Sequence, residues 1–167
     1  MNKLLVLSFI IQMVFASNIE VGFSPKQGSL ELVLKAINSS KSNICMATYS
    51  FTSKPVAMAI LSAKKRGVVI HIVSDNKSNR SKYSATTYLA NNGVEVRLNA
   101  NYAIMHNKFI VIDNQTVETG SFNYSAGAVN KNAENVLVIW NDKQVATKYQ
   151  NECDRLYSEA TTLKAAY

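Results

Sequence analysis

Residues 105–113 read Met-His-Asn-Lys-Phe-Ile-Val-Ile-Asp, and residues 120–123 read Gly-Ser-Phe-Asn. The first run contains the pattern H-x-K-x-x-x-x-D, made by His106, Lys108 and Asp113, and the second contains G-S-x-N. The chain has only 2 histidines, so composition alone would produce the longer pattern in about one case in 250. The two runs together indicate chemistry on a phosphodiester, because they combine a candidate nucleophile with groups that bind phosphate oxygens.

A short strand is expected inside the first run. Phe109–Ile112 is β-branched and aromatic, which is typical of a buried strand. Side chains alternate along a strand, so His106 and Lys108 should face one way and Asp113 the other. We therefore predict that His106 and Lys108 belong to a phosphate site and that Asp113 has a structural role.

The same argument extends to the second run and to the other histidine. Alternation places Ser121 and Asn123 on one face, where a hydroxyl and an amide would join the pocket. His71 lies in the apolar run 69–73 and has no lysine two residues later. We therefore predict a structural role for His71 and a chemical role for His106.

Strand and helix patterns alternate along the rest of the chain. Further strands are expected at 19–23, 43–51, 68–74, 94–98 and 134–140. Helices are expected at 29–37, 55–65, 84–90 and from Asp142 to about Leu163, with Ser53 as an N-cap and Gly67 just past the end of the second helix. This order predicts a single α/β domain with a central, mixed or mostly parallel sheet and helices on both faces.

The first sixteen residues have the features of a secretory signal peptide. Lys3 is a short basic region, Leu4–Phe15 is apolar, and Val14-Phe15-Ala16 resembles a small-residue cleavage site. A membrane-spanning helix needs about 20 apolar residues, so this segment is short for a stable anchor, with an uncleaved anchor as the alternative. We expect one mature domain, residues 17–167, in a bacterial periplasm or secreted, with no stable membrane insertion after cleavage.

Basic residues outnumber acidic ones, 18 lysines and arginines to 11 aspartates and glutamates, for a formal net charge of +7. A basic surface attracts polyanions, of which nucleic acid is the default, and a merely solvated basic surface is the alternative. The basic run 64–66 is explained by a helix end, where cations meet the helix dipole. Another segment is a predicted substrate-binding loop, because basic and aromatic side chains alternate there with Asn and Ser: Lys77, Arg80, Lys82 and Tyr83.

Metal-binding motifs are absent, and the cysteines suggest no catalysis. There is no H-E-x-x-H, no C-x-x-C, no dense acidic cluster and no glycine-rich phosphate loop. These absences favour chemistry by side chains alone, with no metal and no cofactor. Cys45 and Cys153 allow one intramolecular pairing, which export would permit, but Cys45 is equally typical of a buried thiol.

Four further runs carry a resemblance together with the motifs: Ala47–Thr52, Ala63–Val68, Val117–Asn123 and Asn135–Trp140. The sequence resembles the phospholipase D superfamily, and within it the short single-motif branch of secreted bacterial endonucleases. The likeness covers nearly the whole mature chain. It implies a sandwich in which helices pack on both sides of a mixed sheet.

The resemblance also implies roles for individual residues. His106 would be the nucleophile, Lys108 and Asn123 would bind phosphate, and Glu134 would orient the histidine. A nucleophilic imidazole needs one unprotonated nitrogen, and a carboxylate that holds the other N–H fixes that tautomer. The alternative for Glu134 is a solvated residue that merely opens a strand. Ser121 is expected to support the pocket by hydrogen bonding.

These expectations combine into an exported, metal-independent phosphodiesterase. The favoured interpretation is a nonspecific endonuclease that hydrolyses DNA, with RNA as a second substrate, through a covalent phosphohistidine. The reaction needs a second histidine as acid and the chain has one motif, so we expect a homodimer in which two copies of His106 share one site. The alternatives are a phospholipase that acts on lipid phosphodiesters and a catalytically inactive nucleic-acid-binding module.

Overall fold

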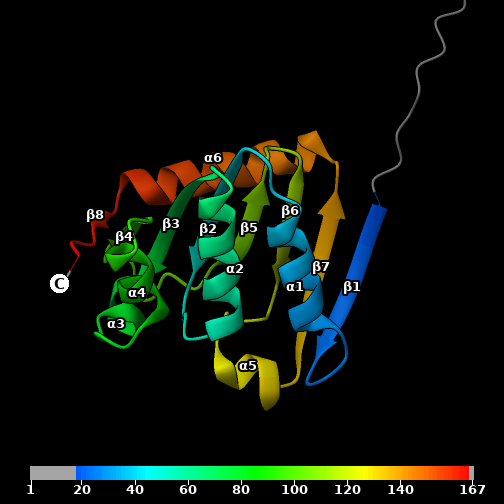
Figure 1. The fold of residues 1–167 in the computed structure, drawn as a ribbon, viewed down its shortest axis with the longest axis horizontal. Helices are drawn as coiled ribbons and strands as arrows, with labels where there is room; N and C mark the ends of the chain where they lie inside the picture. Colours follow the sequence, from blue (N-terminus) through cyan, green and yellow to red (C-terminus); the bar gives the residue numbers. More distant parts are fainter. Residues whose placement is uncertain (1–17, 166–167) are drawn as a thin grey trace, which may run out of the picture.

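The fold is seen in a computed structural model that describes residues 18–165, so the expected signal peptide lies outside the described residues. The strands are β1 (Asn18–Ser24), β2 (Asn43–Thr48), β3 (Val69–Asp75), β4 (Glu95–Asn99), β5 (Lys108–Ile112), β6 (Thr116–Gly120), β7 (Glu134–Trp140) and β8 (Thr161–Thr162). The helices are α1 (Ser29–Asn38), α2 (Lys54–Lys65), α3 (Asn76–Asn79), α4 (Ala85–Asn91), α5 (Ala126–Asn130) and α6 (Lys143–Ser158). The strands form one sheet in the order β1-β7-β6-β5-β2-β3-β4-β8 (Figure 1).

The sheet is mixed, as expected, but parallel pairing is confined to β2, β3 and β4. The other neighbours are antiparallel. Parallel neighbours need a crossover, which α2 supplies between β2 and β3 and α4 between β3 and β4, whereas β5 and β6 are joined by a short turn. The motif strands β5 and β6 lie in the antiparallel part of the sheet. There the end of one strand lies beside the start of the next strand.

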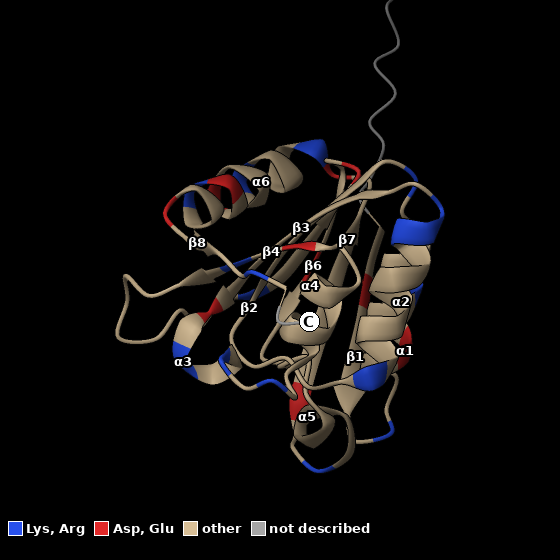
Figure 2. Ribbon diagram, turned by 60° about the vertical axis from the view of Figure 1, so that its left-hand side comes forward, with Lys and Arg blue, Asp and Glu red and all other residues tan. Residues whose placement is uncertain are grey.

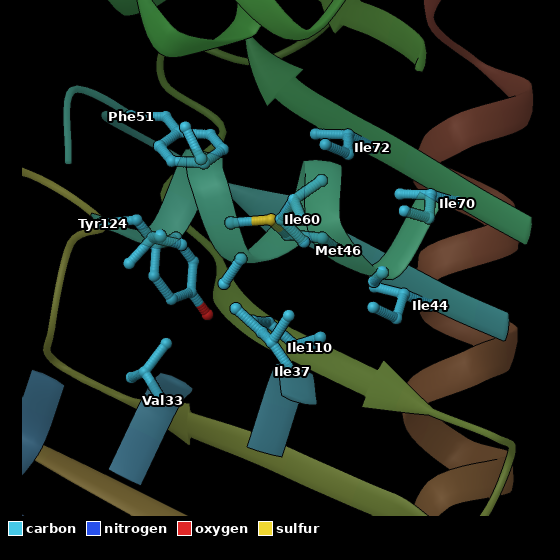
Figure 3. Close-up of a cluster of buried hydrophobic side chains, with 14 of the residues drawn as sticks. Val33, Ile37, Ile44, Met46, Phe51, Ile60, Ile70, Ile72, Ile110 and Tyr124 are labelled. Carbon is cyan, nitrogen blue, oxygen red and sulfur yellow. The ribbon is translucent and has the colours of Figure 1, made fainter. Parts of the chain in front are cut away.

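Helices cover both faces of the sheet, as predicted. α1, α2 and α4 lie on one face and α6 on the other, so the sheet runs between them in Figure 2. The larger core fills the space under α1, α2 and α4. Figure 3 shows Ile44 and Met46 of β2 beside Ile110 of β5, with Val33 and Ile37 of α1 packed onto them. Alternate residues of the central strands thus build this core and leave the others to the opposite face.

The smaller core lies under α6 and contains a disulfide. Cys45 of β2 is bonded to Cys153 of α6, with their Cα atoms 6.4 Å apart, which excludes the buried free thiol. Phe109 of β5 meets Tyr149 of α6 edge to face, with ring centroids 5.0 Å apart. These two contacts fix α6 to the centre of the sheet.

β2 is shorter than its sequence pattern suggests, because a side chain takes over the backbone beyond Thr48. Asn79 donates from Nδ2 to the backbone oxygen of Tyr49 at 2.5 Å, and its Oδ1 accepts from the backbone N–H of Phe51 at 3.2 Å. The chain therefore leaves the sheet at residue 49. Residues 49–53 become a loop at the strand end.

The short helices α3 and α5 were not expected from the sequence, whereas the four longer helices follow the expected pattern with two differences. Ser53 stands at the N-cap of α2 but makes no side-chain capping bond, and Gly67 follows the helix with φ of 91°. α6 ends at Ser158, before the expected Leu163, because Thr161–Thr162 pair with β4. Between residues 18 and 165, no helix is long and apolar enough to cross a bilayer.

Candidate active site

The motif residues converge at one end of the sheet. β5 begins with Lys108, β6 ends at Gly120, and β7 begins with Glu134. These three neighbours alternate in direction, so those ends share one edge. β2 also ends there, since Thr48 pairs with Lys108. In Figure 1 this edge lies on the side of α5.

His106 and Lys108 are in contact at this edge. His106 is exposed, whereas Lys108 is buried, at 8% relative exposure. Lys108 Nζ lies 3.1 Å from His106 Nδ1 and donates to the backbone oxygen of His106 at 2.7 Å. The ring centroid of Tyr49 is 4.5 Å from that of His106 and 5.5 Å from Lys108 Nζ. The two motif side chains are therefore adjacent, although His106 precedes β5 and does not belong to it.

The environment of Lys108 suits it to an anionic ligand. Burial lowers the pKa of Lys108 below its usual value, and the nearby carboxylate of Glu134 opposes that shift. An ammonium group has only donors, so Lys108 Nζ donates to His106 Nδ1 in the tautomer whose ring proton lies on Nε2. Where water is partly excluded, the attraction between an ammonium and a phosphate oxygen is stronger than in bulk solvent.

Ser121 ties the end of β6 to the start of β7. Its Oγ donates to Glu134 Oε2 at 2.7 Å and accepts from the backbone N–H of Asn135 at 3.0 Å. Glu134 Oε1 accepts from Asn132 Nδ2 at 3.0 Å. Within residues 18–165 the Glu134 carboxylate makes no hydrogen bond with His106, so its role in orienting the histidine stays a prediction.

Asn123 brings an unused acceptor to this part of the molecule. Its Oδ1 is buried and has no hydrogen-bond partner in the described part of the chain. A buried oxygen without a donor is costly, so the atom marks a place where a ligand or a second copy could donate. β6 ends at Gly120, so strand alternation does not apply to Ser121 and Asn123, and it was the wrong basis for grouping them.

The glycine of G-S-x-N has a packing role. A Cβ at Gly120 would collide with the backbone oxygen of Asn135 in β7. Only glycine allows the two backbones to approach this closely at the point where Ser121 leaves the sheet. The motif therefore combines one residue that sets backbone spacing with two polar residues that follow it.

Asp113 lies at the opposite end of β5 and anchors the segment before β2. Its Oδ1 accepts from Ser42 N and Oγ, both at 2.8 Å, and from Asn43 N at 3.0 Å, and its Oδ2 accepts from Lys41 N at 2.9 Å. Partial burial raises the pKa of Asp113, but these donors outweigh burial and hold it below the usual value. Strand length, about 16 Å over five residues, separates Asp113 from Lys108. The alternation of side chains along β5 does not explain why Asp113 lies away from the site, because Asp113 has already left the strand, with φ of 52°.

Two other residues support the site without any motif signal in the sequence. Asp75 at the end of β3 is buried and accepts from Ser78 N at 2.8 Å and from Met105 N at 2.9 Å, so it holds the residue before His106. Tyr49 lies beside His106 because β2 and β5 are neighbours. Tyr49 stands in one of the family-like runs, Ala47–Thr52, but the sequence does not show that β2 and β5 are neighbours, so the contact of Tyr49 with His106 could not be predicted.

The predicted basic loop is partly helical, because Lys77 lies in α3 and Arg80 follows it directly, and its four residues divide into two pairs. Lys77 donates to the backbone oxygen of Ala103 at 3.1 Å, and Arg80 donates to a side chain of α3, so both brace the protein itself. Lys82 instead lies with its Nζ 5.1 Å from the ring centroid of Tyr83, which is 83% exposed. Since Ala103 belongs to the loop that leads to the motif histidine, the segment borders the site. Its substrate-binding role stays a prediction.

His71 lies away from the site. It stacks on Tyr157 of α6 with ring centroids 4.9 Å apart, and its Nε2 lies 3.5 Å from a carboxylate oxygen of Glu95. Among residues 18–165, no three side chains of histidine, cysteine, aspartate or glutamate are grouped as metal ligands.

Comparison with known proteins identifies the family. Residues 33–157 match the family described as "Cardiolipin synthase, PLD-like domain". The chain belongs to the phospholipase D superfamily. A crystal structure of a phospholipase D family member, Nuc from Salmonella typhimurium, is similar, with a TM-score of 0.87 and 40% identity over 89% of this chain and 99% of that one.

Two curated relatives place the phospholipase D-superfamily chain among enzymes. A phospholipase D of Rickettsia prowazekii is 31% identical over 151 residues, or 90% of this chain and 72% of that protein. A mitochondrial cardiolipin hydrolase of Xenopus tropicalis is 35% identical over 130 residues, or 78% of this chain and 60% of that protein. The family resemblance is thus confirmed, and the chain is a phosphodiesterase of the phospholipase D superfamily.

Proposed function

We propose that this phosphodiesterase is a metal-independent endonuclease that hydrolyses DNA, with RNA as a second substrate, at a site shared by two copies of the chain. One observation carries the proposal, the exposed imidazole of His106 held 3.1 Å from the buried ammonium of Lys108. A nucleophile open to solvent beside a partly desolvated cation is what attack on a phosphodiester anion requires. The basic segment that borders the site supports a polyanionic substrate.

The reaction proceeds in two displacements. A nitrogen of His106 attacks phosphorus, and the P–O bond to the leaving nucleoside breaks as the P–N bond forms. A second histidine gives the leaving oxygen its proton. Water then attacks the phosphohistidine and returns a proton to that second histidine, while the P–N bond breaks. One phosphodiester and one water thus give one phosphomonoester and one alcohol.

The other site residues prepare these steps. Lys108 Nζ and Asn123 Nδ2 donate to the nonbridging oxygens of the phosphate. When Lys108 Nζ turns to the phosphate, it releases His106 Nδ1, which can then carry the ring proton and leave Nε2 free to attack. Glu134 accepts that Nδ1–H after it has turned from Ser121.

A second copy supplies the acid. The described chain has one H-x-K-x-x-x-x-D motif, and its other histidine, His71, is packed against α6. The site lies on an exposed end of the sheet, so a two-fold axis there would bring His106 of both copies together. The unpartnered Oδ1 of Asn123 is consistent with a donor that arrives from outside the chain.

A phospholipase is the second candidate, and the names of the curated relatives favour it. Both reactions need the same phosphodiester site. The charge distribution around the site favours nucleic acid, because two exposed groups of the basic segment, Lys82 and Tyr83, combine a cation with a ring on which a base can stack.

Export also belongs to the proposal. The disulfide between Cys45 and Cys153 suits an oxidising compartment, and with the expected signal peptide it supports a periplasmic or secreted enzyme.

The test compares substrates directly. Plasmid DNA, an RNA oligonucleotide and cardiolipin vesicles are incubated with wild type and His106→Ala, with and without excess EDTA. We expect wild type, but not His106→Ala, to nick the plasmid, in EDTA as well. Lys148→Ala removes an exposed lysine of α6 and is the control for charge. Lipid hydrolysis without nucleic-acid cleavage would replace the endonuclease by a phospholipase, and activity that returns only with magnesium would reject the metal-independent reaction.

A further inference from the structure

A hollow of about 470 Å³ lies between α2 and α4, beside the active-site edge. Thr52 is part of its lining, and the backbone N–H of Thr52 donates to the oxygen of Tyr124 at 2.9 Å. Tyr124 follows Asn123 directly, so the hollow begins next to the G-S-x-N run. Lys54, Lys82 and Tyr83 also line it.

A second hollow of about 390 Å³ continues along the same two helices. Lys64 and Lys65, at the far end of α2, belong to its lining. The two hollows share Met58 and Tyr88, whose Sδ and hydroxyl are 4.0 Å apart, and both side chains are about half exposed. A bridge of one thioether and one aromatic ring thus separates two hollows that each have two lysines.

The charge along this path has one sign. Residues 52–92 contain seven lysines and arginines and a single acidic residue, Asp75, whose two carboxylate oxygens accept backbone hydrogen bonds. Within residues 18–165, none of the lysines 54, 64, 65 and 82 has an acidic partner. Figure 2 shows basic residues at both ends of α2, whereas α6 across the sheet carries both basic and acidic residues.

We infer that the α2–α4 groove, defined by Lys54, Met58, Lys65, Lys82, Tyr83 and Tyr88, binds the single strand of a nucleic acid that extends from the active site. The inference rests on the proposed endonuclease and names where its substrate lies. Bases stack on Tyr83 and Tyr88, and the lysines neutralise the phosphates between them. α2 is about 18 Å long, so the groove holds several nucleotides in line with the scissile phosphate.

Shape and charge together favour a strand over a lipid surface. A membrane-binding face presents apolar side chains that protrude into the lipid, with cations around them. Here Met58 and Tyr88 are half exposed in the lining of hollows whose volumes suit small planar ligands, and the more exposed ring of Tyr83 lies beside the ammonium of Lys82. Aromatic rings in a basic groove are the usual means of binding single strands without sequence preference.

The experiment measures binding without turnover. His106→Ala protein is titrated against a fluorescein-labelled deoxyoligonucleotide by anisotropy, alone and with a second substitution. We expect Tyr83→Ala and Tyr88→Ala each to raise Kd at least about fivefold, because each removes a stacking surface. Tyr88→Phe keeps the ring and should stay within about twofold. Lys82→Ala should lower the slope of log K against log salt by about 0.7, as for one lost phosphate contact.

Controls and contrary outcomes are defined by the same titrations. Lys148→Ala on α6 should change neither Kd nor the salt slope. Melting temperature checks each fold, and Tyr83, which is almost fully exposed, carries the test if Tyr88→Ala does not fold. The inference would be overturned if both tyrosine variants bound the oligonucleotide as tightly as the His106→Ala parent. It would also be overturned if the tyrosine substitutions weakened binding only to vesicles that contain phosphatidylglycerol. A wild type that binds the strand in this groove but cleaves no nucleic acid would instead reject the endonuclease and keep the groove.

Discussion

The carboxylate of Asp75 accepts a hydrogen bond from the backbone N–H of Met105 at 2.9 Å, and Met105 immediately precedes His106. The other carboxylate oxygen accepts from Ser78 N at 2.8 Å. One buried side chain thus links the end of β3 to the residue before the proposed nucleophile. The position of His106 therefore depends on the carboxylate of Asp75, which lies outside the motif.

Asp75→Asn should impair activity more than stability. Asparagine has one acceptor oxygen, so one of the two backbone N–H groups loses its partner at a cost of about 1–3 kcal/mol. If the lost partner is Met105 N, His106 is no longer held in place. Asp142→Asn is the control, because Asp142 caps α6 in the same way, accepting from Val145 N. Hydrolysis of a small chromogenic phosphodiester and melting temperature are measured for both. Equal losses of activity in the two variants would contradict the positioning role.

Asp113→Asn should lower stability and leave activity per folded molecule intact. The carboxylate accepts four hydrogen bonds at the far end of β5, and an amide cannot accept from Lys41 and Ser42 on both of its atoms. Because the folded-state pKa of Asp113 is depressed, its contribution is present above the unfolded pKa and is lost as pH falls through the folded value. Urea unfolding of wild type and variant should therefore converge at low pH. A stable but inactive variant would show that Asp113 serves the chemistry.

Glu118→Gln should flatten the pH dependence of stability. Burial raises the pKa of Glu118 to about 8, with the hydrogen bond from Tyr124 opposing that shift. Between about pH 4.5 and 8 the folded state holds a proton that the unfolded state has lost, so stability falls as pH rises, by up to about 1.4 kcal/mol per unit. Urea titrations from pH 5 to 8 check this. Glu31→Gln, an exposed change in α1, should keep the wild-type slope, and an identical slope in Glu118→Gln would contradict the assignment.

Replacing both cysteines by alanine should destabilise the fold by about 2–4 kcal/mol. The Cys45–Cys153 bond closes a long loop, with a sequence separation of 108, and such cross-links restrict the unfolded chain strongly. Wild type in reducing agent should match the double variant in urea unfolding. Equal stability of oxidised wild type and the variant would show that packing under α6 suffices without the bond.

Mixed dimers should reveal whether two copies share the site. Wild type is refolded with an equal amount of His106→Ala protein, so that subunits pair at random. If both histidines are needed, about a quarter of the dimers should be active, whereas independent sites would leave about half. The paired imidazoles should also give a bell-shaped pH profile. Activity that follows the wild-type fraction linearly would rule out the shared acid.

The sequence was informative where local pattern decides structure. The apolar patterns predicted the four longer helices and the strands β1 to β7, with boundaries such as Pro55–Lys65 against an observed α2 of Lys54–Lys65, but not α3, α5 or β8. The H-x-K spacing also predicted the contact between His106 and Lys108. These features depend on residues that are close together in the sequence, so they can be predicted from the sequence alone.

Contacts across the sheet could not be predicted in this way. Tyr49 reaches His106 only because β2 and β5 are neighbours, and Asp75 reaches Met105 from a different strand. Alternation failed at Ser121, because β6 ends one residue earlier, at Gly120, beside β7. The sheet order, which sets all three, follows from packing of the whole chain.

The pairing of β1 with β7 bears on when the enzyme becomes competent during its synthesis. The sheet needs residues 134–140 before its first described strand can join it, and the same segment brings Glu134 to the site. A ribosome-bound or partly translocated chain that stops before β7 holds His106 and Lys108 without Glu134 and without the strand that anchors Ser121. Phosphodiester cleavage should therefore stay silent in the nascent chain and begin only after β7 has emerged.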